Sequence, residues 1–232
     1  MATRTSSAGP KRPQRTGKSL QSTQEPPLSL ERIVQAAVEL MDAGGLDGLT
    51  MRRLADHLGS GVMSLYWHVD SKEDVLDLAL DSVLEYQGPT SASRSREDWR
   101  GDVIRMLEDW RACMLRHPWS AALLPRRALG ANILARLELL SRTLSRAGIA
   151  DEDLNAAIWS IWNHVMGATV TLANFDRSDD ARKAATQRRP EGTGGDYPTI
   201  EGSRLLLDED WDGAFRKGLG FLLDGLPLKK VD

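Results

Sequence analysis

Apolar residues recur at three- and four-residue intervals along most of the chain, which is the spacing of one face of an α-helix. The first such segment follows Ser29, a suitable helix cap, and the Gly44-Gly45 pair marks its end. Shorter helices are expected over 50–58, 62–68 and 71–84. Longer ones are expected over Trp99–Arg116, Ala131–Ala147, Asp151–Phe175 and 209–223. No strand alternation or internal repeat is present, so the predicted fold class is all-α.

Two breaks in this pattern divide the chain. Residues 28–87 carry the short helices and are predicted to form a helix-turn-helix domain of three helices plus the start of a connecting helix. Residues 88–232 are predicted to form a larger helical domain for ligand binding and dimerisation. The polar, glycine- and proline-bearing stretch 177–203 within it is expected to be a mobile loop.

Residues 1–27 have too few apolar groups to offset the entropy of ordering and are predicted to be a disordered arm. Up to residue 24 the arm has basic residues and no acidic one, although the whole chain of 232 residues has a formal net charge of −3. Such an asymmetry is expected where one end meets phosphates, but a solvated leader explains it equally well. Contact between the arm and DNA is left open.

Composition excludes several other classes of protein. No apolar stretch reaches the roughly 20 residues that a bilayer-spanning helix needs, and the basic N-terminus lacks the apolar core of a secretory signal. Cys113 is the single cysteine, so no intramolecular disulfide is possible. These features predict a cytoplasmic protein without a membrane partner.

The segment 50–68 predicts how the N-terminal domain works. A helix, a tight turn at 59–61 and a second short helix follow one another, and in helix-turn-helix proteins the second helix enters the major groove. Leu65 is the inward apolar residue of this helix. Its neighbours are then free to face outward: Val62, Met63, Ser64, Tyr66 and His68.

Exposed methionine and tyrosine beside hydroxyl and imidazole groups suit a DNA surface. Hydroxyl groups can donate to phosphates, and apolar groups can contact a thymine methyl. Lys72, at the start of the next helix, can add a phosphate contact. Trp67 and Val69 are expected to pack rather than to contact DNA, Arg53 to be a solvated charge, and an ordinary surface role for His68 stays open.

The run from Ile33 to Val83 closely resembles the DNA-binding domain of the TetR (tetracycline-repressor-like) family. The resemblance rests on residues 48–55, on the Leu-Tyr-Trp-His-Val string at 65–69, and on Lys72. It implies a homodimeric repressor that binds double-stranded operator DNA and releases it when a small molecule binds. By resemblance Thr50 and Arg52 lie near the DNA backbone and groove, and phosphates are contacted by Ser64, Tyr66, His68 and Lys72. Met51, Val62 and Met63 depart from the tetracycline repressor's residues at base-facing positions, so a different operator is expected.

The larger domain resembles the same family more faintly, through His117-Pro118, Gly167 and the closing helix. In such proteins the helix equivalent to Asp151–Phe175 and the closing helix form a four-helix dimer interface. A stripe of apolar and small residues fits this role: Ile158, Ile161, Val165, Ala168, Thr169 and Leu172. The alternative is the ordinary core of a monomer.

Six of the seven tryptophans lie beyond residue 98, which suggests aromatic walls for a flat hydrophobic effector. Ordinary core packing of tryptophans at helical spacing is the alternative. The candidate ligand-binding residues are Trp110, His117, Trp119, Trp159, Trp162, Asn163 and His164.

A metal or other cofactor is not expected. His117 occupies the position of the tetracycline repressor's metal-binding histidine, but Asn163 and Thr171 replace the further polar partners, which argues against a drug–magnesium chelate. Cys113 and His117 share a helix face and could hold zinc only with further ligands that the sequence does not indicate.

Two other function classes were weighed against a ligand-responsive repressor. An enzyme is disfavoured because the chain lacks a phosphate-binding glycine loop, an HExxH motif and a GxSxG nucleophile motif. A DNA-binding regulator without an effector remains possible. It would bind its operator with no response to small hydrophobic molecules.

Overall fold

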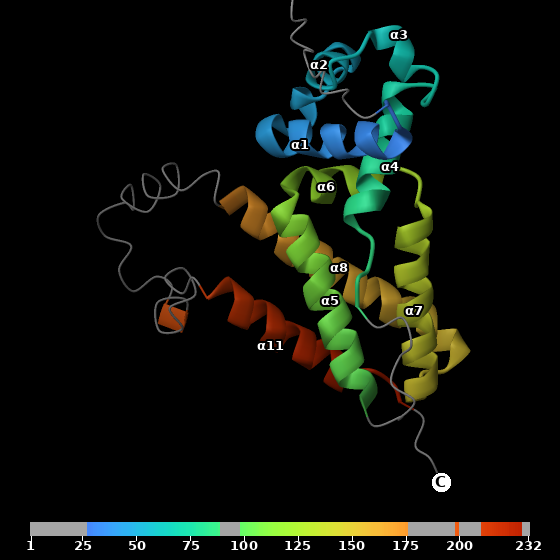
Figure 1. The fold of residues 1–232 in the computed structure, drawn as a ribbon. Coiled ribbons are helices and arrows are strands. Elements are labelled where there is room, and N and C mark those ends of the chain that lie inside the picture. The colour runs from blue at the N-terminus through green and yellow to red at the C-terminus, as the bar shows by residue number, and fades with distance from the viewer. Residues whose placement is uncertain (1–26, 89–97, 176–197, 200–209, 229–232) are drawn as a thin grey trace, which may run out of the picture.

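A computed structural model of the chain describes residues 27–88, 98–175, 198–199 and 210–228. Within these ranges the secondary structure is helical, and the one β-type pairing is an isolated bridge between Ile149 and Leu228. A small N-terminal unit lies at one end of a larger helical unit (Figure 1). The all-α prediction is therefore confirmed. The predicted arm (1–27) and mobile loop (177–203) fall almost wholly outside the described residues.

The small unit contains α1 (Leu30–Gly48), α2 (Met51–His57) and α3 (Val62–Leu65). The hydroxyl oxygen of Ser29 accepts a hydrogen bond from the Arg32 amide at the start of α1, and that of Thr50 accepts one from the Arg53 amide at the start of α2. Gly45 adopts φ of +63° and kinks α1, which then continues to Gly48, beyond the end predicted at Gly44-Gly45. A buried core joins the three helices: Ile33, Ala37, Met41, Leu54, Ala55 and Leu65.

Helix α4 (Lys72–Val83) begins in the small unit and reaches the larger one (Figure 1). The Ser71 hydroxyl accepts from the Asp74 amide at 3.1 Å, as the predicted capping box requires. The returning bond is shifted by one residue, because the Asp74 carboxylate accepts from the Asp70 amide, at 3.0 Å. The cap therefore also fixes the turn that connects α3 to α4.

The larger unit contains α5 (Trp99–Arg116), α6 (Pro118–Leu123), the 3₁₀ turn η2 (Leu124–Arg126), α7 (Ala131–Ala147), α8 (Asp151–Phe175) and α11 (Trp211–Asp224). The four longer helices agree with the predicted ones to within two residues at each end. Helix α6 was not predicted. It begins at Pro118, whose fixed φ and missing N–H suit the first position of a helix.

Helix α4 is fastened to α7 by a carboxylate that caps the second helix. Gly130 precedes α7 and offers no side-chain cap, whereas the Asp81 carboxylate accepts the amides of Asn132, at 3.0 Å, and Ile133, at 3.2 Å. A Cβ added at Gly130 would collide with this carboxylate. One turn earlier, Arg127 pairs with the Asp77 carboxylate. The end of α4 therefore moves with the start of α7.

The fully buried Arg136 side chain adds a third link between the same helices. Its Nε–H donates to the carbonyl of Leu84, and its Nη2–H donates to the carbonyl of Glu85 at 3.0 Å. Both carbonyls lie just beyond α4, where an α-helix leaves its acceptors free. The Arg136 guanidinium is also 2.9 Å from the Asp109 carboxylate on α5. It thus ties α4, α5 and α7 together.

A separate contact joins α1 to the beginning of α6. The Asp42 carboxylate accepts a hydrogen bond from the Trp119 indole N–H at 2.7 Å and lies 2.9 Å from Nδ1 of His117. Trp119 is buried, and Asp42 is partly open to solvent. The small unit is consequently held to the larger one through both α1 and α4.

Replacing Asp81 by alanine is expected to lower the free energy of unfolding by about 1–2 kcal/mol, because two α7 amides lose their acceptor. Urea unfolding at a fixed protomer concentration measures this difference. The control is Glu85→Ala, which removes an exposed carboxylate from the same segment and keeps the backbone acceptor. Equal stability of the two variants would contradict the capping role of Asp81.

Candidate DNA-binding surface and effector cavity

The short helix α3 and the turn after it present a row of side chains to solvent. Leu65 and Val69 are both buried, and this pair anchors the turn between them on the core of the small unit. The three residues between the anchors must therefore point outward. Tyr66 is 43% exposed and Trp67 is 88% exposed, while Met63 on α3 itself is 75% exposed. His68 is also exposed.

Trp67 corrects one prediction. It was expected to pack in the core, yet it is the most exposed of the large apolar side chains in the described residues. The reason is that α3 ends at Leu65, three residues before the end of the expected span 62–68, so Trp67 does not lie on a helix face. In the turn that follows, only Val69 returns to the core.

The remaining predicted DNA-binding residues surround this row. Arg52 and Ser64 are exposed, and Thr50 is exposed while its oxygen caps α2. Met51 and Val62 are partly buried against the hydrophobic core, so each offers only part of its side chain to a partner. Lys72 is partly exposed at the first position of α4. Together these residues form one candidate DNA-binding surface on the small unit, consisting of Thr50, Met51, Arg52, Val62, Met63, Ser64, Tyr66, Trp67, His68 and Lys72.

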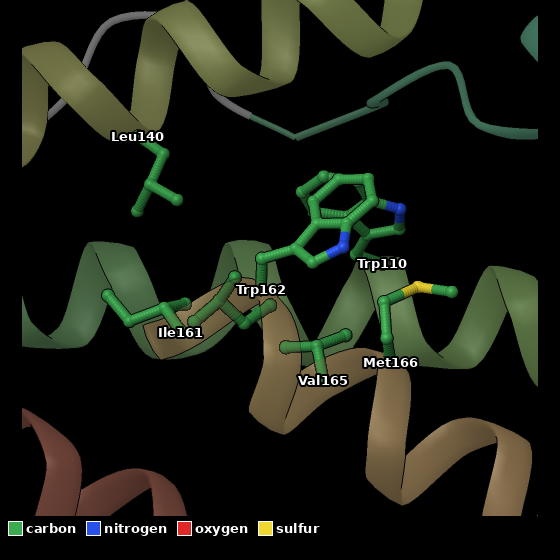
Figure 2. A pocket seen from close by; sticks show the side chains of 7 residues that line it. Trp110, Leu140, Ile161, Trp162, Val165 and Met166 are labelled. Carbon is green, nitrogen blue, oxygen red and sulfur yellow. The ribbon is translucent and has the colours of Figure 1, made fainter. Parts of the chain in front are cut away.

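The larger unit contains a narrow apolar cavity between α5, α7 and α8. Figure 2 shows Trp110, Trp162 and Met166 gathered at it. Its volume is about 10 Å³, room for roughly one water molecule. The lining offers almost no polar surface, so the cavity is apolar, and it is too small for a ring system. The lining residues are Leu107, Trp110, Leu140, Ile161, Trp162, Val165 and Met166.

The outer wall of the cavity is formed by its two partly exposed members, Trp162 and Met166. The Trp162 ring meets the buried Trp110 ring edge to face, with 5.1 Å between the ring centroids. Methionine has three flexible torsions and adapts readily to a new neighbour. A flat ligand could therefore enter by displacing these two side chains.

The structure separates the seven predicted ligand-binding residues into three groups. Trp110 and Trp162 line the cavity, and Trp159 is exposed beside Trp162, with 6.1 Å between their ring centroids. His117 and Trp119 instead contact Asp42 at the junction of the two units. Asn163 is exposed, and Nε2 of His164 lies 3.0 Å from the Phe215 carbonyl on α11.

Two residues that line the cavity were predicted from the sequence to lie at a dimer interface. Ile161 and Val165 were placed in the predicted dimer stripe together with Thr169, but all three are buried within one protomer. This part of the stripe prediction is wrong, because the α8 face that carries these residues packs on α5, α6 and α7. The helical period identified an apolar face of α8 without indicating which neighbour covers it.

A different face of α8, with α11, offers apolar surface to solvent. Trp159 and Val170 on α8 and Phe221 on α11 are exposed. The two helices pack closely, since a Cβ added at Gly218 would lie 2.6 Å from the His164 ring. A Cβ added at Gly167 would meet no atom of the described residues within 4 Å, so among them this part of α8 is uncovered. The exposed residues form one candidate association face.

Metal-binding chemistry finds little support among the described residues. They contain no cluster of three or more histidine, cysteine, aspartate or glutamate side chains suited to a metal ion. Burial raises the pKa of the Cys113 thiol, which disfavours the thiolate form that zinc requires.

No described helix has the length and apolar character of a membrane-spanning segment.

Comparisons with known proteins agree with this architecture. Residues 33–79 match the family model described as bacterial regulatory proteins of the tetR family, and residues 92–229 match the tetracyclin repressor-like C-terminal domain. An HTH-type transcriptional regulator of Saccharopolyspora erythraea is 39% identical over 209 residues, 89% of this chain and 87% of its own. The HTH-type transcriptional repressor DrrR1 of Streptomyces coeruleorubidus is 38% identical over 156 residues, covering 66% of this chain and 57% of its own.

Among solved structures, Streptomyces coelicolor ActR in complex with actinorhodin superposes with a TM-score of 0.72 and 28% identity. The superposition covers 86% of this chain and 95% of ActR. The small unit thus matches the N-terminal family model, and the larger unit matches the C-terminal one. The fold as a whole matches that of ActR. This chain belongs to the TetR family of bacterial transcriptional regulators.

Proposed function

We propose that the protein is a ligand-responsive repressor that binds operator DNA as a homodimer in the cytoplasm and releases it when a planar aromatic effector binds. The observation that carries the DNA-binding part is the row of exposed side chains held between the buried anchors Leu65 and Val69. A helix-turn-helix places such a row against base edges and phosphates in the major groove.

Within this surface we assign different tasks to different side chains. The apolar Met63 and Trp67 are the most exposed and suit contacts with bases, including thymine methyl groups. Tyr66, His68 and Lys72 carry donors suited to phosphate oxygens. Base contacts select the sequence and phosphate contacts fix the orientation, so Met63 and Trp67 determine which operator is preferred.

The association face on α8 and α11 supports the homodimer. Two copies of Trp159, Val170 and Phe221 would be covered in a two-fold arrangement of four helices, as the family resemblance implies. A dimer presents two α3 helices to successive major grooves, about 34 Å apart. It therefore reads two half-sites at once.

Effector response follows from the position of the cavity. Its lining comes from α5, α7 and α8, and α4 is fastened to α7 through Asp81 and Arg136. Opening the cavity for a ligand shifts these helices and carries α4 with them. A conformation with a different separation between the two α3 helices is then favoured, and operator affinity falls. The ActR complex with actinorhodin supports a small-molecule effector for this fold.

The variant Trp67→Ala is expected to lower operator affinity about tenfold or more, roughly 1.4 kcal/mol, while thermal stability stays unchanged because the side chain is almost fully exposed. The operator is first selected from bound genomic fragments, and affinity is then measured by fluorescence anisotropy. Gln35→Ala, an exposed change on α1, is the matched control. Wild-type affinity of the Trp67 variant would refute the assigned surface.

A charge placed on the association face should separate the protomers. Phe221→Glu is expected to weaken dimerisation at least about thirtyfold, roughly 2 kcal/mol, because a carboxylate would replace an aromatic anchor. Sedimentation velocity over a concentration series measures the effect. Leu134→Glu, at an exposed leucine on α7, serves as the control, and an equal effect of both substitutions would contradict the assigned interface.

A panel of planar aromatic compounds separates a responsive repressor from a constitutive regulator. At least one compound is expected to quench tryptophan fluorescence, raise the melting temperature and release the selected operator at the same concentrations. Intact operator binding with no response to any compound would favour a regulator without an effector.

A further inference from the structure

On the Trp110 side of the effector cavity lies a buried charged group, the guanidinium of Arg136. The Arg136 guanidinium carbon lies 5.8 Å from the centre of the Trp110 ring and 5.1 Å from the centre of the Tyr86 ring. Arg136 is one helical turn before Leu140, which lines the cavity from the same helix. The buried cation and the cavity are therefore adjacent and share Trp110.

Two buried donors at this place lack acceptors in the described structure. Arg136 donates through Nε and Nη2, whereas its Nη1 has no hydrogen-bond partner among the described residues. The indole N–H of Trp110 has none either. An unsatisfied buried donor costs about 1–3 kcal/mol, so two such donors beside one cavity indicate an acceptor that arrives from outside the chain.

The charges around Arg136 define the kind of acceptor. Asp109 lies 2.9 Å from Nη2 and neutralises the cation from the α5 side. A full negative charge is therefore not required on the other side, and a neutral oxygen is enough to complete the set of hydrogen bonds. The remaining walls of the cavity are apolar and aromatic, which suits a flat ring system that carries such an oxygen.

We propose that the effector is a planar aromatic molecule whose carbonyl or carboxylate oxygen accepts hydrogen bonds from Nη1 of Arg136 and Nε1 of Trp110. This inference rests on the proposed function and specifies its effector class. Arg136 also holds the two carbonyls at the end of α4. The residue that recognises the effector is then the one that fastens the DNA-binding unit, so recognition and operator release share one side chain.

Xanthone and xanthene provide a matched pair of probes, since they share a tricyclic skeleton and differ at C9, which is a carbonyl in xanthone and a methylene in xanthene. Binding is measured by quenching of tryptophan fluorescence in the full chain, and release of the selected operator by anisotropy. Xanthone is expected to bind at least tenfold tighter than xanthene. In Arg136→Met the ratio should fall below about threefold.

Trp110→Phe keeps an aromatic wall and removes only the N–H donor, so it tests the site without removing a buried charge. It should also reduce the preference for xanthone. Equal affinity of the two probes in the wild type, or an undiminished ratio in both variants, would overturn the inference. Leu134→Met, an exposed change on α7, is the control and should leave the ratio as in the wild type.

Xanthene-9-carboxylate distinguishes the two sources of the oxygen. Tighter binding than xanthone would identify an acidic effector, and weaker binding would identify a neutral carbonyl. Either result supports an acceptor site, provided that Arg136→Met removes the difference in affinity between the two probes. Operator release by xanthene as effective as by xanthone would leave the proposed repressor standing and refute the acceptor site. Failure of all three probes to bind, while another compound of the aromatic panel binds and releases the operator, would refute the acceptor site and leave the repressor standing.

Discussion

The free carbonyls at the end of α4 set the main constraint on this structure. A helix end that is buried must find donors for its last acceptors. Here the donors come from Arg136, a side chain of the larger domain, and the first amides of α7 in turn depend on Asp81 of α4. Each helix completes the hydrogen bonding of the other. The two domains are therefore joined through buried backbone groups. Separating the domains would leave these groups without hydrogen-bond partners, which costs free energy.

This exchange explains how a small DNA-binding unit can respond to events in a separate core. Surface contacts alone would let the unit pivot freely on the larger domain. The α4–α7 links and the Asp42 contacts with His117 and Trp119 instead hold it at two places, one on α4 and one on α1. In the proposed function, a displacement of α5 or α7 therefore moves the whole unit. The aromatic cavity lies between those two helices and α8.

The sequence predicted the helices well because their periodicity, caps and glycines are local signals. Ser29, Thr50 and Ser71 cap helices as expected, and Gly45 interrupts α1. The orientation of single residues was less predictable. Trp67 was expected inside because aromatic residues usually pack, but the length of α3 decided its direction.

Tertiary partners were the least predictable feature. The apolar period of α8 could not indicate whether Ile161 faces another protomer or its own core, and His117 gave no sign of its contact with Asp42, 75 residues earlier. No pattern in the sequence marks Arg136. Only the fold shows that its side chain is wholly buried among α4, α5 and α7.

The small volume of the cavity has a consequence for the threshold of the response. When the binding-competent conformation is a minor fraction of the population, the apparent dissociation constant is the intrinsic one divided by that fraction. A cavity of about 10 Å³ means that an open form must be populated before any ring system fits. Packing around Trp162 and Met166 therefore sets the concentration at which the regulator switches, independently of how well the effector is recognised. Changes in these two side chains could tune sensitivity while leaving specificity in place.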